Sequence, residues 1–213
     1  MQSSRFLHRA ACLTLCALLP LLAASCLAQT GDRDSWNQTD RVMVDLNLKP
    51  GLTIADVGCG DGYFTFRLAK AVSDAGRVYA EDISEGYLNI IKQRAAQDHL
   101  ANIQTVLGEP TDARLQPESL DVAFICDVLH EVPVPQRLPL VQSVCKAIKP
   151  GGLLFIIDYR KRHEVTCDPY DILIPHDELV GFATNCTMAL DAEFHYLHWQ
   201  VFLRFLKPPK PPG

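Results

Sequence analysis

The feature that most constrains the fold of this chain is an alternation of short apolar segments with stretches long enough to form a helix. Five apolar segments occur, at 52–57, 77–80, 103–107, 120–126 and 153–157. One helix is predicted to end near Ala71, and two more are predicted at about 86–98 and 135–148. The last apolar segment lacks polar alternation, which is typical of a strand buried on both faces. Strands separated by helix-length segments predict right-handed crossovers and a parallel sheet.

The C-terminal part of the chain departs from this alternation. A helix is predicted at about 176–185, and two strand-like segments follow at 188–194 and 196–205, with only His195 between them. Strands this close in sequence turn back on each other. We therefore predict an α/β fold: a single Rossmann-like, seven-stranded, mostly parallel sheet with a C-terminal antiparallel hairpin and helices on both faces. Its expected parts are a lead-in helical segment (29–50), the domain (51–206) and a proline-rich tail (207–213).

Length and charge narrow the class of protein further. A chain of 213 residues suits one α/β domain better than two. The net charge is −5, and two of the 20 basic residues but none of the 25 acidic ones lie in the first 28 positions. The rest therefore carries a net charge of about −7. Such a body has no electrostatic reason to bind phosphate backbones, so nucleic acid is not expected as a partner.

The first 28 residues have the pattern of a targeting segment. Arg5, His8 and Arg9 precede a nearly continuous apolar run at 10–28 that ends in small residues, as in secretory signals. Cleavage after Ala28 would release a secreted or periplasmic domain. Acylation of Cys26, which lies in a lipoprotein-like box, or retention of the run would instead tether the protein to a membrane. A mitochondrial presequence is the alternative.

The eight cysteines do not form a metal site. Cys12, Cys16 and Cys26 belong to the targeting segment, and the other five show no metal-ligand spacing. We predict no bound metal. Cys167 and Cys186 are the one pair that we would test as a disulfide.

The segment at 56–63 (DVGCGDGY) connects a predicted strand to a predicted helix. Glycine at 58 and 60 permits positive φ and a close approach of the backbone to a ligand. The unpaired N–H groups at the start of the following helix would be offered to a carboxylate of the ligand. Asp56 and Asp61 border the turn, and a site for a pyrophosphate would not be expected to carry such carboxylates. The segment therefore favours a ligand with positive charge.

A second acid is expected at the end of the next strand, where it would accept both hydroxyls of a ribose. Asp82 stands there, and its neighbour Glu81 is expected to face elsewhere because side chains alternate along a strand. Choosing Asp82 places Ile83 where an apolar side chain would cover an adenine.

From about 51 to 159 the chain resembles the class I S-adenosylmethionine (SAM)-dependent methyltransferases, and in particular small methyltransferase-domain proteins with an N-terminal signal segment. Four segments carry the likeness: 56–62, the acid at 82, the fourth strand with its loop at 120–132, and the turn at 149–154. The resemblance implies SAM as cofactor but does not give a substrate; a small-molecule acceptor is expected. It implies cofactor contacts from Asp56, Gly58, Gly60, Asp61, Gly62, Tyr63, Asp82, Ile83, Asp112 and Asp127.

His130 and Glu131 are the predicted catalytic residues. They follow the fourth strand, where a base could take a proton from the methyl acceptor. Asp158 and Tyr159 end the fifth strand and are expected to line the same crevice. The alternative is that His130 is a loop histidine bonded to nearby backbone and Glu131 a solvated acid.

Two other functions are compatible with parts of the pattern. A catalytically inactive methyltransferase-like binding module would suit an exported protein, because SAM is a cytosolic metabolite. A nicotinamide-dependent oxidoreductase would need glycine at position 63, which is Tyr63. The sequence identifies neither the acceptor nor the oligomeric state.

Overall fold

The computed structural model describes residues 33–159 and 173–210. It divides into two units, one ending at Thr39 and one from Asp40 onwards. The first contains α2 (Arg33–Trp36), and α3 (Thr39–Leu46) lies almost wholly in the second. The remaining helices are α4 (Thr65–Val72), α5 (Glu85–Gln97), α6 (Val134–Ala147) and α7 (His176–Thr184). The strands are β1 (Thr53–Val57), β2 (Arg77–Asp82), β3 (Ile103–Leu107), β4 (Leu120–Cys126), β5 (Ile148–Tyr159), β6 (Ala189–Phe194) and β7 (Gln200–Leu206).

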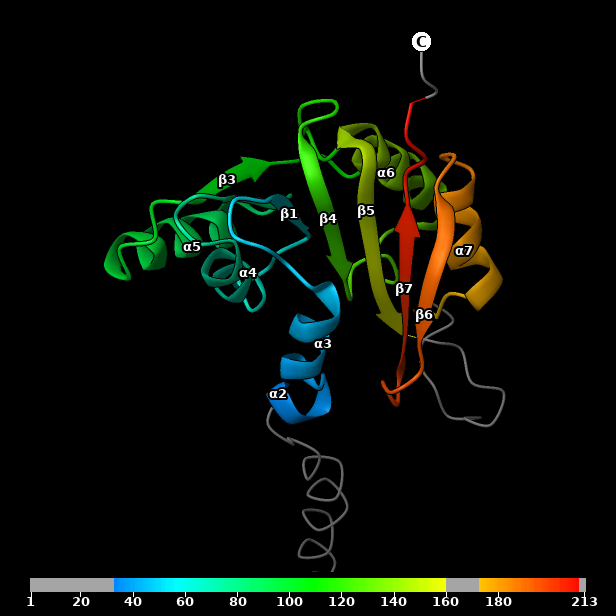
Figure 1. The fold of residues 1–213 in the computed structure, drawn as a ribbon, viewed down its shortest axis with the longest axis horizontal. Helices are drawn as coiled ribbons and strands as arrows, with labels where there is room; N and C mark the ends of the chain where they lie inside the picture. The colour runs from blue at the N-terminus through cyan, green and yellow to red at the C-terminus, as the bar shows by residue number, and fades with distance from the viewer. Residues whose placement is uncertain (1–32, 160–172, 211–213) are drawn as a thin grey trace, which may run out of the picture. The chain divides into compact units, whose positions relative to one another are not determined.

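The seven strands form one sheet in the order β3-β2-β1-β4-β5-β7-β6 (Figure 1). Strands β1 to β5 pair in parallel, whereas β7 runs antiparallel to both β5 and β6. This arrangement confirms the predicted seven-stranded, mostly parallel sheet with its antiparallel end. After β1 the chain forms β2 and β3 on one side of β1, and it later forms β4 on the other side of β1. The neighbouring carboxyl ends of β1 and β4 therefore form a topological switch point, where open α/β sheets bind ligands.

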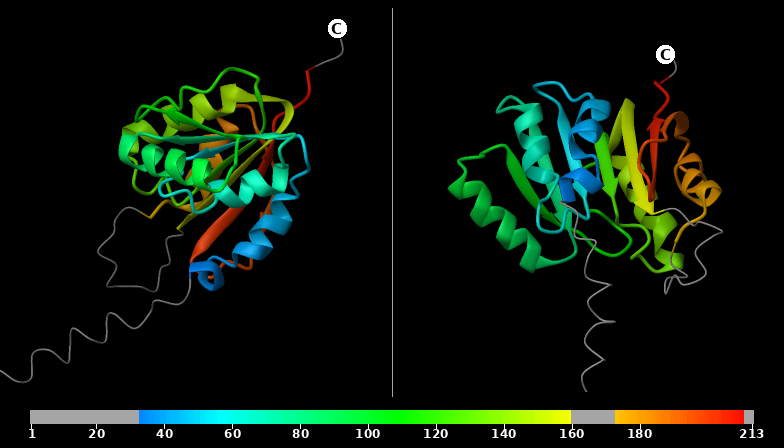
Figure 2. Two further views of the ribbon diagram at one scale, coloured as in Figure 1. Left: turned by 90° about the vertical axis from the view of Figure 1, so that its left-hand side faces the viewer. Right: turned by 90° about the horizontal axis from the view of Figure 1, so that it is seen from below.

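Helices cover both faces of the sheet, as predicted (Figure 2). Adjacent residues of a central strand supply the two cores, because successive side chains point to opposite faces. Phe124 of β4 is buried with Val42 of α3 and Leu68 of α4, and Ile125 is buried with Leu140 of α6 and with α7. Within the described residues, no helix is long and apolar enough to cross a bilayer.

Two predicted boundaries are wrong. β5 begins at Ile148 instead of 153, because its first residue pairs with Leu120 before a shift in register. The last two strands are separated by residues 195–199 and not by His195 alone, since Phe194 pairs with Phe202 across the hairpin. The lead-in segment forms two short helices, of which α3 packs on the main body through Val42 and Leu46.

The targeting segment at 1–28 and Cys167 lie outside the described residues, so export and the Cys167–Cys186 disulfide stay predictions. The thiol of Cys186 donates to the carbonyl of Phe182 at 3.1 Å.

Candidate active site at the carboxyl edge of the sheet

The glycine turn after β1 adopts the backbone that its sequence predicts. Gly58, Gly60 and Gly62 have φ of 68°, 52° and 83°, in the left-handed region that favours glycine. At position 58 a Cβ would lie 2.5 Å from a methyl group of Val128, which belongs to the loop after β4. A Cβ at position 60 would meet no atom within 4 Å. The turn therefore packs against the β4 loop at Gly58 and borders open space at Gly60.

Both acids at the end of β2 contact this turn. The Asp82 carboxylate accepts the N–H of Gly60 at 2.9 Å and that of Ser84 at 2.8 Å. The Glu81 carboxylate accepts the N–H of Gly58 at 3.2 Å. The expectation that Glu81 faces away from the turn is wrong. Because its glycines adopt positive φ, the turn crosses the carboxyl end of β2. The N–H groups of the turn therefore contact side chains from both sides of that strand.

Glu81 is buried, with 2% of its surface exposed. The pKa of Glu81 is raised from 4.5 to about 8, mainly by desolvation and in smaller part by the nearby carboxylates Asp82 and Asp56, against the lowering effect of the Gly58 N–H. Glu81 is therefore largely protonated at neutral pH. Gly108 leaves room for it, since a Cβ at that position would overlap the Glu81 carboxyl oxygen.

The other predicted residues of the turn have different surroundings. Asp56 is buried and accepts the Thr65 hydroxyl at 2.6 Å, which ties the end of β1 to the start of α4. Asp61 accepts the N–H of Tyr63 at 3.2 Å in an exposed turn. Of the two carboxylates, Asp61 is thus the one exposed to solvent.

Ile83 and Asp112 follow the carboxyl ends of β2 and β3. Ile83 is 61% exposed, which leaves it available to cover a flat ligand. Asp112 is exposed and its carboxylate accepts the N–H of Arg114 at 2.8 Å. Its main chain pairs with Glu109 in a small bridge. Both residues lie where the prediction put them, after neighbouring strands at one edge of the sheet.

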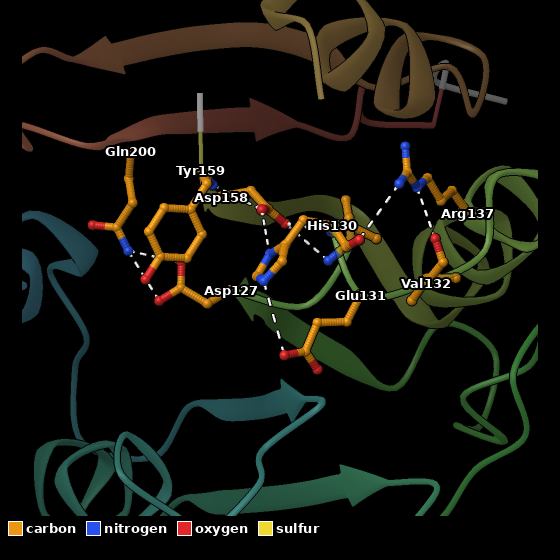
Figure 3. Close-up of polar contacts among 9 residues, drawn as sticks. Asp127, His130, Glu131, Val132, Arg137, Asp158, Tyr159 and Gln200 are labelled. Carbon is orange, nitrogen blue, oxygen red and sulfur yellow. Dashed lines mark hydrogen bonds and ion pairs between the residues drawn. The ribbon is translucent and has the colours of Figure 1, made fainter. Parts of the chain in front are cut away.

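Across the switch point, Asp127 follows β4 with a φ of 56°. Its two carboxylate oxygens accept from the Gln200 side-chain amide at 2.7 and 2.9 Å (Figure 3). Gln200 opens β7 and is itself buried. This contact fixes the start of the β4 loop to the antiparallel end of the sheet.

His130 lies between two carboxylates (Figure 3). Its Nδ1 is 2.8 Å from the Oδ1 of Asp158, which is fully buried at the end of β5. Its Nε2 is 3.9 Å from Glu131, whose side chain is 78% exposed. The imidazole packs edge-on against the ring of Tyr159, with the centroids 5.0 Å apart. The alternative for His130, a hydrogen bond from its ring to nearby backbone, does not occur; the ring bonds to a carboxylate.

Arg137 of α6 holds the loop that carries His130 and Glu131. Its side chain is buried, and its Nε donates to the carbonyl of Val132 at 2.8 Å (Figure 3). A second guanidinium nitrogen lies 3.5 Å from the carbonyl of His130. Arg137 therefore ties two carbonyl groups of this loop to α6.

Sequence reasoning did not identify Glu81, Arg137 or Gln200 as parts of this site. The available signal for Glu81 was its position beside Asp82 at the carboxyl end of β2. No local signal marks Arg137 or Gln200, because the packing of helices and strands brings their hydrogen-bonding partners to them.

With the geometry in place, residues 54–152 match the family model described as a methyltransferase domain. The matched segment spans β1 to β4 and enters β5, so it contains the glycine turn, both β2 acids and the His130 loop.

Curated relatives carry the name demethylmenaquinone methyltransferase. The one from Staphylococcus aureus is 31% identical over 118 residues, which are 55% of this chain and 47% of the relative. The one from Staphylococcus saprophyticus is 32% identical over 124 residues, 58% of this chain and 51% of the relative. The chain thus spans about half the length of the curated relatives that it matches.

Solved structures share the fold of this chain. A SAM dependent methyltransferase from Aquifex aeolicus has a TM-score of 0.73 and 23% identity, covering 82% of this chain and 92% of that one. Phosphoethanolamine N-methyltransferase 2 from Haemonchus contortus, solved with S-adenosyl-L-methionine, has a TM-score of 0.69 and 15% identity, covering 82% of this chain and 53% of that one. At these identities the likeness is one of fold.

Proposed function

We propose that the chain binds SAM at the carboxyl edge of its sheet and transfers the methyl group to a small-molecule acceptor. The observation that carries the proposal is the contact between Gly60 and Asp82, which joins the glycine turn of β1 to the acid of β2. When bound, SAM supplies a methyl group on a positively charged sulfur. The residues of the chain bind and orient it and position the acceptor within attacking distance.

The residues present fit an adenosyl group. The open space over Gly60 lies beside the Asp82 carboxylate. Each oxygen of that carboxylate accepts one backbone N–H and, with two lone pairs, has capacity for one more donor. Two ribose hydroxyls would use that capacity. Ile83, exposed next to Asp82, is placed to cover the adenine.

The acceptor is proposed to be a small molecule and not a nucleic acid, because the body of the protein is acidic. The names of the curated relatives make a demethylmenaquinone the first acceptor to test. The carboxylates of Asp82 and Asp61 add negative potential around the turn, which favours the cationic cofactor over a dinucleotide.

The cofactor site is tested by calorimetry with SAM and with NADH. Wild type should bind SAM, and Asp82→Ala should weaken that binding by roughly 2–4 kcal/mol, from about 1.5–3 kcal/mol for each of two charge-assisted bonds less partial rescue by water. Asp98→Ala is the matched control, since Asp98 caps the far end of α5. Equal SAM affinity in wild type and Asp82→Ala would refute the site, and NADH binding without SAM binding would favour the oxidoreductase alternative.

We further propose that residues 1–28 direct export or anchoring. Mass spectrometry of the protein from its own host tests this proposal. A mature chain beginning at Gln29 would support cleavage, and an acylated Cys26 would support a lipid tether. A chain that keeps its first 28 residues in a soluble fraction would contradict both.

A further inference from the structure

The buried carboxylate at the end of β5 has a role that cofactor binding does not explain. Asp158 is fully buried and receives four donors. Its Oδ2 accepts the N–H groups of Leu129 at 2.8 Å and His130 at 3.3 Å. Its Oδ1 accepts the N–H of Tyr159 at 2.8 Å and contacts His130 Nδ1 at 2.8 Å. Asp158 therefore binds both the backbone and the ring of His130.

These contacts determine which ring nitrogen of His130 carries the proton. An ionised carboxylate only accepts hydrogen bonds, so Nδ1 must be the donor in the contact with Asp158. In neutral imidazole the other nitrogen, Nε2, is then an acceptor. The backbone bonds to Leu129 and His130 keep the carboxylate from turning away. The ring is held from the side by Tyr159.

The ring presents Nε2 on the side away from Asp158. Asp158 occupies the Nδ1 side of the ring, and Glu131 approaches the opposite side (Figure 3). At 3.9 Å Glu131 is too distant for a hydrogen bond to Nε2. Val128, two residues before His130, packs on Gly58. The loop that carries His130 therefore lies against the turn beside which the cofactor is proposed to bind.

We propose that Asp158 is a positioning residue that holds His130 Nε2 as the proton acceptor for methyl transfer. This inference rests on the proposed function. The arrangement of Asp158 and His130 suits an acceptor whose attacking atom carries a weakly acidic proton, such as a hydroxyl on an aromatic ring or an activated carbon. His130 Nε2 takes that proton while the freed electron pair bonds to the methyl carbon and the carbon–sulfur bond breaks. The positive charge of the sulfonium ends on the imidazolium, which Asp158 stabilises.

The charges around His130 favour this role. Burial alone lowers the pKa of His130, but the hydrogen bond that it donates to Asp158 and the negative charges of Asp158, Asp127 and Glu131 raise the pKa above 6.5. The neutral ring is the active form, so proton acceptance should increase as pH rises through this pKa.

The arrangement is tested by nitrogen NMR of protein labelled with ¹⁵N-histidine, with the His130 signals assigned from His130→Gln. Wild type should show the proton on Nδ1 at high pH. In Asp158→Asn the side-chain amide donates to Nδ1, so the proton should move to Nε2 and the pKa of His130 should fall. A His130 that keeps the Nδ1 proton in Asp158→Asn would overturn the proposal. Asp177→Asn is the matched control: Asp177 lies 3.2 Å from His176, and its loss should change the signals of His176 alone.

A second measurement needs no variant, so it applies even if Asp158→Asn fails to fold. If Nε2 faces the transferred methyl group, the positive sulfur of SAM should lower the pKa of His130 relative to S-adenosylhomocysteine, whose sulfur is neutral. The expected difference is on the order of half a unit to one unit. Equal pKa values with both ligands bound would overturn this inference alone. Failure of both ligands to bind by calorimetry would overturn the proposed function as well.

Discussion

Replacing Glu81 by glutamine tests whether burial controls the protonation of the acid beneath the glycine turn. Glutamine keeps an oxygen that accepts the Gly58 N–H and has nearly the same shape, but it cannot ionise. The pKa of Glu81 is raised from 4.5 to about 8, with desolvation as the largest cause. Each unit of difference between the folded and unfolded pKa corresponds to about 1.4 kcal/mol.

The sign of the pH dependence follows from that raised pKa. Below pH 4.5 both states of wild type hold the proton, and wild type and Glu81→Gln should differ little. Between pH 4.5 and 8 the unfolded chain ionises while the folded chain keeps its proton, so wild-type stability falls by about 1.4 kcal/mol per pH unit. At pH 7.5 Glu81→Gln should therefore be more stable than wild type by about 4 kcal/mol. Above pH 8 the difference should level off.

Urea unfolding at pH 5, 6.5, 7.5 and 8.5 measures this difference directly. Glu85→Gln is the matched control, because Glu85 is an exposed acid four residues further on. Its effect should stay within about 0.5 kcal/mol at every pH. An effect of Glu81→Gln that does not change between pH 5 and 8 would refute the argument from burial.

Four further variants, in three tests, probe the supports of the site by urea unfolding. Gly58→Ala and Gly60→Ala impose the same left-handed strain of about 1 kcal/mol, but only Gly58→Ala adds a clash, with Val128. Gly58→Ala should therefore cost about 1–3 kcal/mol more stability than Gly60→Ala. Equal costs would contradict the packing at Gly58. Arg137→Met removes the donors to the loop carbonyls and should cost about 2 kcal/mol, whereas a neutral effect would mean that the loop is held without it. Gln200→Leu removes two bonds to Asp127 and should cost about 1.5–3 kcal/mol, and unchanged stability would show that this contact is not formed in solution.

Local patterns predicted most of the fold. The segments at 103–107 and 120–126 became β3 and β4 with those bounds. For β4 the reason is that a strand buried in a parallel sheet needs an apolar run and little else. The prediction that the hairpin turns at His195 alone was wrong, because the pairing of Phe194 with Phe202 depends on how β7 lies against β5 and β6 against β7. A one-dimensional pattern does not contain that register.

The sequence by itself determined the order of strands and helices, the glycine turn and the presence of Asp82 one strand away. These follow from side-chain periodicity and from the φ values that only glycine adopts easily. The tertiary structure alone decided that Glu81 is buried and protonated, that Gln200 binds Asp127 from 73 positions away, and that Asp158 binds the ring of His130. Protonation and tautomer depend on desolvation and on partners across the sheet, and packing brings those partners together from distant parts of the chain.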